Sequence, residues 1–297
     1  MAPSRDTVLT LGVFDGLHLG HCHLLARLRH LALPAYLPGV VTFINHPLNV
    51  LRPGSDVRYI ADPEKKIGLL QEQGMDLVVP LEFTPELSLV SARDFVSLLV
   101  DHLKMKGLVV GPDFAVGHHR EGNINVLRQL GSEMGFWVEL VEALHLDGVL
   151  VKSSRIREAI SQGDLEASAR LLGRRFSLSG VVVRGDGRGR ELGFPTANVA
   201  VRPQMLLPGD GIYASWAIIN GVRRPSATSV GVRPTFGLSE RLVEVYIMDY
   251  QADLYGQQIE VEFVGKLRDQ ETFPSIAALT QQIDTDVANA RLALARG

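Results

Sequence analysis

The chain has 297 residues, of which 46% are hydrophobic and 21% charged, so it is long and apolar enough to form two ordinary domains. Its net charge of −3 argues against general affinity for nucleic acid or acidic membranes, so any anion site must be local. The sequence has no membrane-spanning apolar run and no signal-peptide pattern, and its single cysteine, Cys22, excludes an internal disulfide. We therefore expect a cytoplasmic protein without nucleic-acid or membrane partners, and its oligomeric state stays open.

The N-terminal stretch carries the clearest local signal for function. Val8–Val13 is predicted to be a buried strand, Asp15-Gly16 a turn, and Leu19–Leu31 a helix. A helix that begins after such a turn offers free N–H groups and a partial positive charge to a phosphate. His18 and His21 are three residues apart, so they share one face of the helix and can donate hydrogen bonds to phosphate oxygens. By spacing alone, phosphate chemistry and ordinary structural histidines are about equally favoured.

The same stretch resembles the G-x-F-D-G-x-H-x-G-H signature of the nucleotidyltransferase superfamily. The resemblance implies that His18 and His21 hold the phosphates of ATP while a nucleoside monophosphate is transferred and pyrophosphate leaves. The other residues of the signature that we assign to nucleotide or phosphate binding are Gly12, Phe14, Asp15 and Gly20. Strands and helices alternate as far as about residue 175, which predicts a Rossmann-like parallel sheet with right-handed crossovers.

Two polar loops follow predicted strands of this sheet, where ligands bind in open α/β folds. His46 follows the strand Pro38–Ile44, and a ligand contact and a plain polar loop residue are about equally favoured there. Asp113 follows the strand Gly107–Gly111 in a glycine-rich loop, where it can accept hydrogen bonds from a nucleotide or flavin edge. We assign His46 and Asp113 to flavin binding, and Lys65, in another predicted helix, could reach a phosphate.

A second phosphate site is predicted at Lys152–Arg157. The serines can cap the helix Arg155–Gln162, and Arg157 adds a guanidinium group. Alone, this string is an ordinary capping motif with exposed arginines. Beside the histidine turn it resembles the S-S-x-x-I-R element of the superfamily, which implies that Ser153, Ser154 and Arg157 hold the far phosphates of ATP.

The periodicity changes after Arg174-Arg175, where the pattern becomes strands broken by glycine and proline. We therefore predict domains 1–175 and 176–297. Consecutive antiparallel strands with hairpin turns predict that the second domain is a small closed barrel of six strands. The long helix Ser275–Leu294 follows the barrel.

The loop Gly185–Gly193 can bring backbone N–H groups around an anion because its glycines carry no Cβ. A merely flexible hairpin is the alternative. Against it, Thr196 and Asn198 follow two residues apart on an extended segment, so their oxygens face the same side and could coordinate Mg²⁺. The loop residues assigned to phosphate binding are Gly185, Gly187, Gly189, Arg190 and Gly193.

Glu244 lies in the predicted strand Arg241–Ile247, on the same face as Leu242 and Tyr246. If that face is inward, burial raises the pKa of the carboxyl group and favours base chemistry. Without further context, an exposed glutamate is favoured by about two to one.

The second half resembles the riboflavin kinase domain through G-R-x-L-G-F-P-T-A-N, R-P-T-F and the acid of V-E-V. Together with the first half, the chain is similar to the bacterial bifunctional riboflavin kinase/FAD synthetases. The resemblance implies an enzyme that phosphorylates riboflavin to FMN and adenylylates FMN to FAD, with ATP as co-substrate and Mg²⁺ as cofactor. It further implies that Glu244 is the general base, that Thr196 and Asn198 hold Mg²⁺, and that Arg268 contacts the flavin.

The chain departs from the family pattern at one loop. The family usually reads G-x-D-F-R-F-G, whereas this chain has Ala115-Val116 in place of the arginine and aromatic residue, which predicts weaker flavin binding or slower adenylylation. One alternative is therefore a riboflavin kinase with a weakened or regulatory N-terminal domain. The other is a non-catalytic flavin or nucleotide sensor, against which the retained acid–base and metal residues argue.

Overall fold

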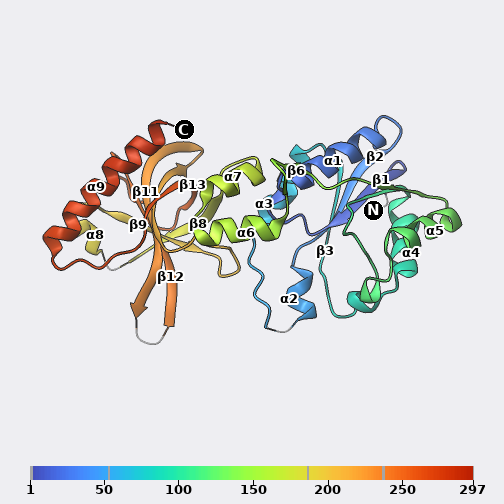
Figure 1. Ribbon diagram of the computed structural model, residues 1–297, viewed down its shortest axis with the longest axis horizontal. Coiled ribbons are helices and arrows are strands. Elements are labelled where there is room, and N and C mark those ends of the chain that lie inside the picture. The colour runs from blue at the N-terminus through green and yellow to red at the C-terminus, as the bar shows by residue number, and fades with distance from the viewer. Residues whose placement is uncertain (1–2, 53, 186, 236–237, 297) are drawn as a thin grey trace. The chain divides into compact units, whose positions relative to one another are not determined.

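The computed structural model describes residues 3–52, 54–185, 187–235 and 238–296, which form two compact units (Figure 1). The first unit comprises Met1–Tyr59 and Pro63–Lys152, and the second comprises Ile60–Asp62 and Ser153–Gly297. This division follows compactness alone, and the functional boundary near residue 175 stays a prediction.

The first unit is built on a parallel five-stranded sheet with the order β3-β2-β1-β4-β5, which confirms the predicted Rossmann-like fold. Its central strand β1 is buried on both faces, because Val8 packs in one apolar cluster with Leu25 and Leu70 while Leu9 packs in another with Phe95 and Leu127. The strands are β1 (Thr7–Gly12), β2 (Leu37–Phe43), β3 (Leu77–Leu81), β4 (Met105–Val110) and β5 (Trp137–Leu140).

Helices cover both faces of this sheet. The helices are α1 (Leu19–Ala32), α2 (Pro47–Leu51), α3 (Pro63–Glu72), α4 (Ala92–Leu103) and α5 (Ile124–Met134). The 3₁₀ turn Asp15–Leu17 contains the predicted turn Asp15-Gly16. Shorter elements that the sequence pattern did not predict are the 3₁₀ turns Leu87–Leu89 and His118–Arg120 and the small hairpin of β6 (His145–Leu146) and β7 (Val149–Leu150). The carboxyl ends of β1, β2 and β4 form one edge, where ligands bind in such folds.

The second unit begins with α6 (Ser153–Gln162) and α7 (Leu165–Leu172) and continues into a closed barrel with the strand order β10-β11-β12-β9-β8-β13. All its strand pairs are antiparallel, so the predicted six-stranded barrel is confirmed. The strands are β8 (Ser177–Val183), β9 (Thr196–Val201), β10 (Gly211–Ile219), β11 (Val222–Thr235), β12 (Leu238–Ile247) and β13 (Gln258–Arg268).

The long C-terminal helix α9 (Ile276–Ala295) lies along the outside of the barrel (Figure 1). Its residues Ala290 and Leu294 pack in an apolar cluster with Ala214, Ala227 and other residues on the outer face of the strands. A short helix, α8 (Arg188–Glu191), interrupts the glycine-rich segment that we expected to be an irregular loop.

Candidate active sites

The connection between β1 and α1 is a buried turn with a strained backbone. Phe14, Gly16 and Leu17 all have left-handed φ angles, of 51°, 76° and 38°. Such conformations cost about 1–3 kcal/mol at a non-glycine residue and persist only where the surroundings impose them. A Cβ on Gly12 would lie 3.0 Å from the Phe14 ring, so glycine lets this ring pack against the end of the strand.

His18 caps the N-terminus of α1 and stacks on His21. The Nδ1 atom of His18 accepts a hydrogen bond from the His21 backbone N–H at 3.2 Å, and the two ring centroids are 3.6 Å apart with an angle of 15° between the planes. Because Nδ1 is an acceptor, the proton of a neutral His18 lies on Nε2, which is then a donor for a phosphate oxygen. A Cβ on Gly20 would lie 3.1 Å from that ring, so this glycine allows the stack to form at the helix start.

Lys66 of α3 lies beside this turn, and the sequence reasoning missed it. Its side chain is buried, and its ammonium group donates hydrogen bonds to the carbonyl oxygens of Val13, at 3.1 Å, and Phe43. Burial lowers the pKa of Lys66 to about 8, although the nearby negative charge of Asp15 acts in the opposite direction. The helical spacing of Lys66 and Leu70 is the signal that could have placed it on the buried face, whereas Lys65 is exposed.

A cavity of 730 Å³ adjoins the turn. His46 and Asp113, the two residues assigned to flavin binding in the first unit, line this cavity. Gly12 and Val13 form one part of its wall, and His46 and Asp113 form others. Such an apolar wall with a few polar groups suits a planar aromatic ligand. The remaining lining is largely apolar and includes Phe43, Phe83, Phe95, Phe114, Ala115 and Val116.

His46 caps a helix and also lines the cavity, so its assignment to flavin binding stays a prediction. Its Nδ1 atom accepts a hydrogen bond from the Leu48 N–H at 3.2 Å and thereby caps α2, while the residue also lines the cavity. Asp113 is exposed, and its backbone carbonyl accepts a hydrogen bond from Arg120 at 2.7 Å. The loop that carries the departure at Ala115-Val116 is therefore part of the cavity wall.

The predicted second phosphate element lies at the start of α6, in the second unit. The helix begins at Ser153, two residues before the predicted start at Arg155, so Ser153 and Ser154 belong to its first turn. Ser153 and Arg157 are four residues apart on the helix and share one face. Hydroxyls and a guanidinium group are thus present at one helix end.

In the barrel, Asn198, Glu244 and Ser229 form a polar row across three neighbouring strands. Glu244 of β12 pairs with Asn198 of β9 on one side and with Ser229 of β11 on the other. Residues that lie directly opposite in an antiparallel pair point to the same face, so the three side chains are neighbours. Thr196 lies two residues from Asn198 on the same strand and shares that face.

The glycine-rich segment closes over this row. A Cβ on Gly185 would lie 2.3 Å from the amide nitrogen of Asn198, and one on Gly189 would lie 3.2 Å from the Thr196 hydroxyl. Only glycine allows the backbone to approach Asn198 this closely. The hydroxyl and amide oxygens beneath it are the kind of ligand that Mg²⁺ takes, so the residues present fit a magnesium ion.

Glu244 borders a cavity of 770 Å³ and does not point into the barrel core. The buried face of β12 carries Val243 and Val245, whereas Glu244 is half-buried on the other face. An inward orientation would have placed the Glu244 carboxylate among apolar groups. The structure does not have this orientation. Gln270, which sequence reasoning missed, lines the same cavity and donates a hydrogen bond to the Ser229 hydroxyl at 2.9 Å.

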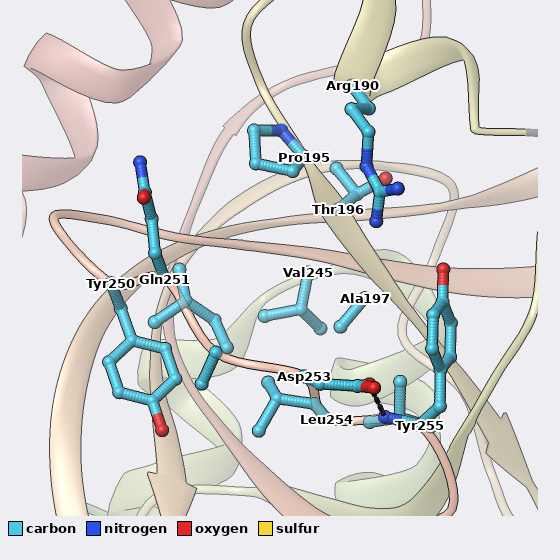
Figure 2. Close-up of a pocket in the computed structure, with 13 residues that line it drawn as sticks. Arg190, Pro195, Thr196, Ala197, Val245, Tyr250, Gln251, Asp253, Leu254 and Tyr255 are labelled. Carbon is cyan, nitrogen blue, oxygen red and sulfur yellow. Dashed lines mark hydrogen bonds between the residues drawn. The ribbon is translucent and has the colours of Figure 1, made fainter.

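Thr196 lines a separate cavity of 510 Å³ (Figure 2). Figure 2 shows Arg190 with its guanidinium group beside Thr196, and Tyr250 and Tyr255 on opposite walls. Aromatic walls with a cationic group at the Thr196 end suit a nucleotide whose phosphates point toward Thr196. The sequence analysis assigned no role to either tyrosine, because local sequence patterns do not reveal a cavity.

Arg268 is held by an ion pair in the structure. Its guanidinium group makes hydrogen bonds of 2.7–3.1 Å to the carboxylate of Asp286 on α9. Among the described residues that line the Glu244 cavity, Arg268 does not occur. Two positions of the predicted motifs, Asp186 and Phe236, lie outside the described residues, as do the side chains of Arg188 and Arg233.

These features define a class of protein. A buried, strained turn on a parallel sheet and a glycine-rich segment over hydroxyl and amide oxygens on a barrel are typical of a nucleotide-dependent transferase with two catalytic domains. Among the residues that the structure describes, no helix is both long and apolar enough to span a membrane.

Comparisons with known proteins agree with this class. A family model described as FAD synthetase matches residues 1–155, and one described as riboflavin kinase matches residues 172–294. A bifunctional riboflavin kinase/FMN adenylyltransferase of Pseudomonas fluorescens is 38% identical over 97% of this chain and 93% of its own length. Its counterpart in Escherichia coli (strain K12) is 36% identical over 98% and 93%.

A solved structure, described as a macrolide-efflux protein from Streptococcus pneumoniae, has the same fold, with a TM-score of 0.91 and 28% identity. The match covers 98% of this chain and 95% of that one. The chain belongs to the family of bifunctional riboflavin kinase/FMN adenylyltransferases. It is an enzyme with both catalytic domains, which favours the two activities over a riboflavin kinase alone.

Proposed function

We propose that the two activities reside in two separate ATP sites, one in each of the predicted domains 1–175 and 176–297. The barrel phosphorylates riboflavin, and the parallel-sheet domain adenylylates the FMN that results. The pairing of Glu244 with Asn198 carries this proposal, because it puts a carboxylate beside the metal-type oxygens in a different unit from the histidine turn.

In the kinase reaction, the 5′-hydroxyl oxygen of riboflavin attacks the γ-phosphorus of ATP, and ADP leaves. Glu244 takes the hydroxyl proton, which requires the flavin to lie in the 770 Å³ cavity that this residue borders. The polar row with Ser229 and Gln270 holds the ribityl chain in that cavity. Arg268 supports the flavin side of the barrel through its ion pair with Asp286.

Thr196 and Asn198 would hold Mg²⁺, which neutralises charge on the ATP phosphates when it is bound. The backbone of Gly185, Gly187, Gly189 and Gly193 surrounds the phosphates, and Arg190 adds a positive charge. The adenine base occupies the 510 Å³ cavity between Tyr250 and Tyr255. Catalysis here depends mainly on positioning and charge stabilisation.

In the adenylylation reaction, a phosphate oxygen of FMN attacks the α-phosphorus of a second ATP, and pyrophosphate leaves without a protein nucleophile. His18 and His21 donate hydrogen bonds to the phosphates as charge develops on them, while Ser153, Ser154 and Arg157 bind the far phosphates. The flavin lies in the 730 Å³ cavity with His46 and Asp113. Gly12, Phe14, Asp15 and Gly20 shape the turn.

Incubation of the purified protein with riboflavin, ATP and Mg²⁺, followed by chromatography of the flavins, tests the proposal. FAD is the expected product, and its formation should stop when Mg²⁺ is removed. FMN without FAD would show that the first domain lacks its activity, and unchanged riboflavin would contradict both sites. We further propose that the enzyme acts in the cytoplasm, where ATP is available and its single cysteine stays reduced.

A further inference from the structure

The carbonyl group of Val13 is held by two buried side chains just before the strained turn. It accepts hydrogen bonds from the Thr42 hydroxyl at 3.2 Å and from the Lys66 ammonium at 3.1 Å. Lys66 also donates to the Phe43 carbonyl, so one ammonium group joins the carboxyl ends of β1 and β2. No sequence motif of the family accounted for this lysine.

The position of Lys66 is unusual because lysine is rarely buried without a carboxylate partner at hydrogen-bond distance. The side chain is only 6% exposed, and its ammonium group donates hydrogen bonds to the two backbone carbonyls. Asp15, only 4% exposed on the turn that packs against α3, supplies the nearby negative charge. A buried charge with this arrangement stabilises one specific backbone geometry at a desolvation cost.

We propose that Lys66 is a positioning residue for adenylyl transfer: its ammonium group clamps the carboxyl ends of β1 and β2 and thereby fixes the turn that presents His18 and His21. The inference rests on the proposed placement of adenylyl transfer at this turn. The residue after Val13 is Phe14, whose φ of 51° requires the preceding carbonyl to be oriented and held. A displacement of about 1 Å at such a turn can cost about a hundredfold in rate.

Protonation of Lys66 supplies a readout that a purely structural role does not. The groups around its ammonium are Asp15 from the turn, the carbonyls of β1 and β2, and the Thr42 hydroxyl, with Tyr59 close enough to Asp15 to be influenced by its charge. The pKa of Lys66 is lowered from 10.5 to about 8 by burial, so the clamp loses its charge as the pH rises through about 8. Adenylylation should fall over that range.

The stability of the fold should change in the opposite direction. Between about pH 8 and 10.5 the unfolded chain binds the Lys66 proton and the folded chain does not, so the contribution of this group to the free energy of unfolding rises with pH. Loss of adenylylation above about pH 8 therefore cannot be attributed to unfolding caused by Lys66. The riboflavin kinase activity of the same polypeptide serves as an internal control.

The test compares Lys66→Met and Lys66→Arg with Lys106→Met, a control at an exposed position of β4. The kcat for conversion of FMN to FAD is measured from about pH 7 to about pH 9.5, with formation of FMN from riboflavin in parallel. Lys66→Met should lower kcat about 10- to 100-fold near neutral pH and remove the alkaline decline. Lys66→Arg keeps a permanent charge, so it should retain more activity than Lys66→Met and also show no decline. Lys106→Met should match the wild type.

Wild-type kcat for FAD formation that does not fall above about pH 8, or a Lys66→Arg profile that still falls, would overturn the inference. These two profiles decide the question even if Lys66→Met does not fold. The variant His21→Ala distinguishes a wrong role for Lys66 from a wrong location of the adenylylation site. If His21→Ala abolishes FAD formation and Lys66→Met leaves it unchanged, the role of Lys66 is wrong and the site is right. If His21→Ala leaves it unchanged, the site itself is wrong.

Discussion

The strained turn of the first unit and the polar row of the barrel differ mainly in burial. Asp15, His18 and Lys66 are almost entirely enclosed, whereas Asn198 and Glu244 are half-buried under a largely exposed glycine-rich segment. Buried groups are held by their neighbours before any substrate arrives, so the first site is pre-organised. The barrel site is open, and its substrates must complete it. Packing should therefore matter most in the first site, and individual side chains in the second.

The barrel side of this comparison predicts the largest single effect, for Glu244→Gln. The amide cannot accept the hydroxyl proton, so formation of FMN from riboflavin should fall by about 10²–10⁴-fold, while conversion of added FMN to FAD continues. Steady-state assays with each flavin measure both. Glu271→Gln is the matched control, because Glu271 lines the same cavity from another segment. A loss of both activities in Glu244→Gln would contradict separate sites.

The buried turn predicts a somewhat smaller loss in the opposite activity. His21→Ala removes a donor to the ATP phosphates and should slow FAD formation by about 10²–10³-fold without changing riboflavin phosphorylation. His23→Ala, at an exposed position of the same helix, should be indistinguishable from wild type. Equal effects of the two substitutions on FAD formation would show that the helix, and not the stacked pair, is what matters.

Thr196 allows a sharper test of the open site with two substitutions of similar size. Thr196→Val keeps the shape but removes the hydroxyl oxygen, and it should raise the Mg²⁺ concentration for half-maximal kinase activity about tenfold, equivalent to one lost contact of about 1.4 kcal/mol. Thr196→Ser keeps the oxygen and should need a near-normal concentration. Titration of Mg²⁺ in the kinase assay measures this. Identical requirements for both variants would remove Thr196 from the metal site.

Asp286→Asn should have the smallest effect on catalysis. The substitution removes the charge that pairs with Arg268 in a mostly buried ion pair, which should lower the free energy of unfolding by about 3 kcal/mol. Asp249→Asn breaks the exposed pair with Arg291 and should cost less than about 1 kcal/mol. Denaturant unfolding measures both. If Asp286→Asn changes the KM for riboflavin more than about tenfold with little loss of stability, Arg268 acts on the flavin directly.

The sequence predicted what depends on local order along the chain. Strand–turn–helix alternation and hairpin signals were sufficient for the parallel sheet and the six-stranded barrel, and the motifs placed His18, Thr196 and Asn198 correctly on their elements. Element ends were less predictable. Helix α4 ends at Leu103, because Lys104 adopts a left-handed φ of 51° and β4 begins at Met105.

The rest depends on contacts between distant segments. Lys66 reaches carbonyls 53 and 23 residues away, and Gln270 reaches Ser229 from 41 residues away, so no local pattern reveals either contact. For a similar reason, the sequence did not decide whether Glu244 faces the barrel core. Alternation assigns it to one side of β12, but only barrel closure and the packing of α9 show which side is buried.

The most direct test of two separate sites mixes the two inactive variants. Glu244→Gln and His21→Ala are incubated together with riboflavin, ATP and Mg²⁺, and the flavins are separated by chromatography. Alone, Glu244→Gln should leave riboflavin unchanged, and His21→Ala should accumulate FMN. The mixture should form FAD, because FMN released by one variant is adenylylated by the other. A mixture that forms no FAD, although Glu244→Gln converts added FMN, would contradict the account.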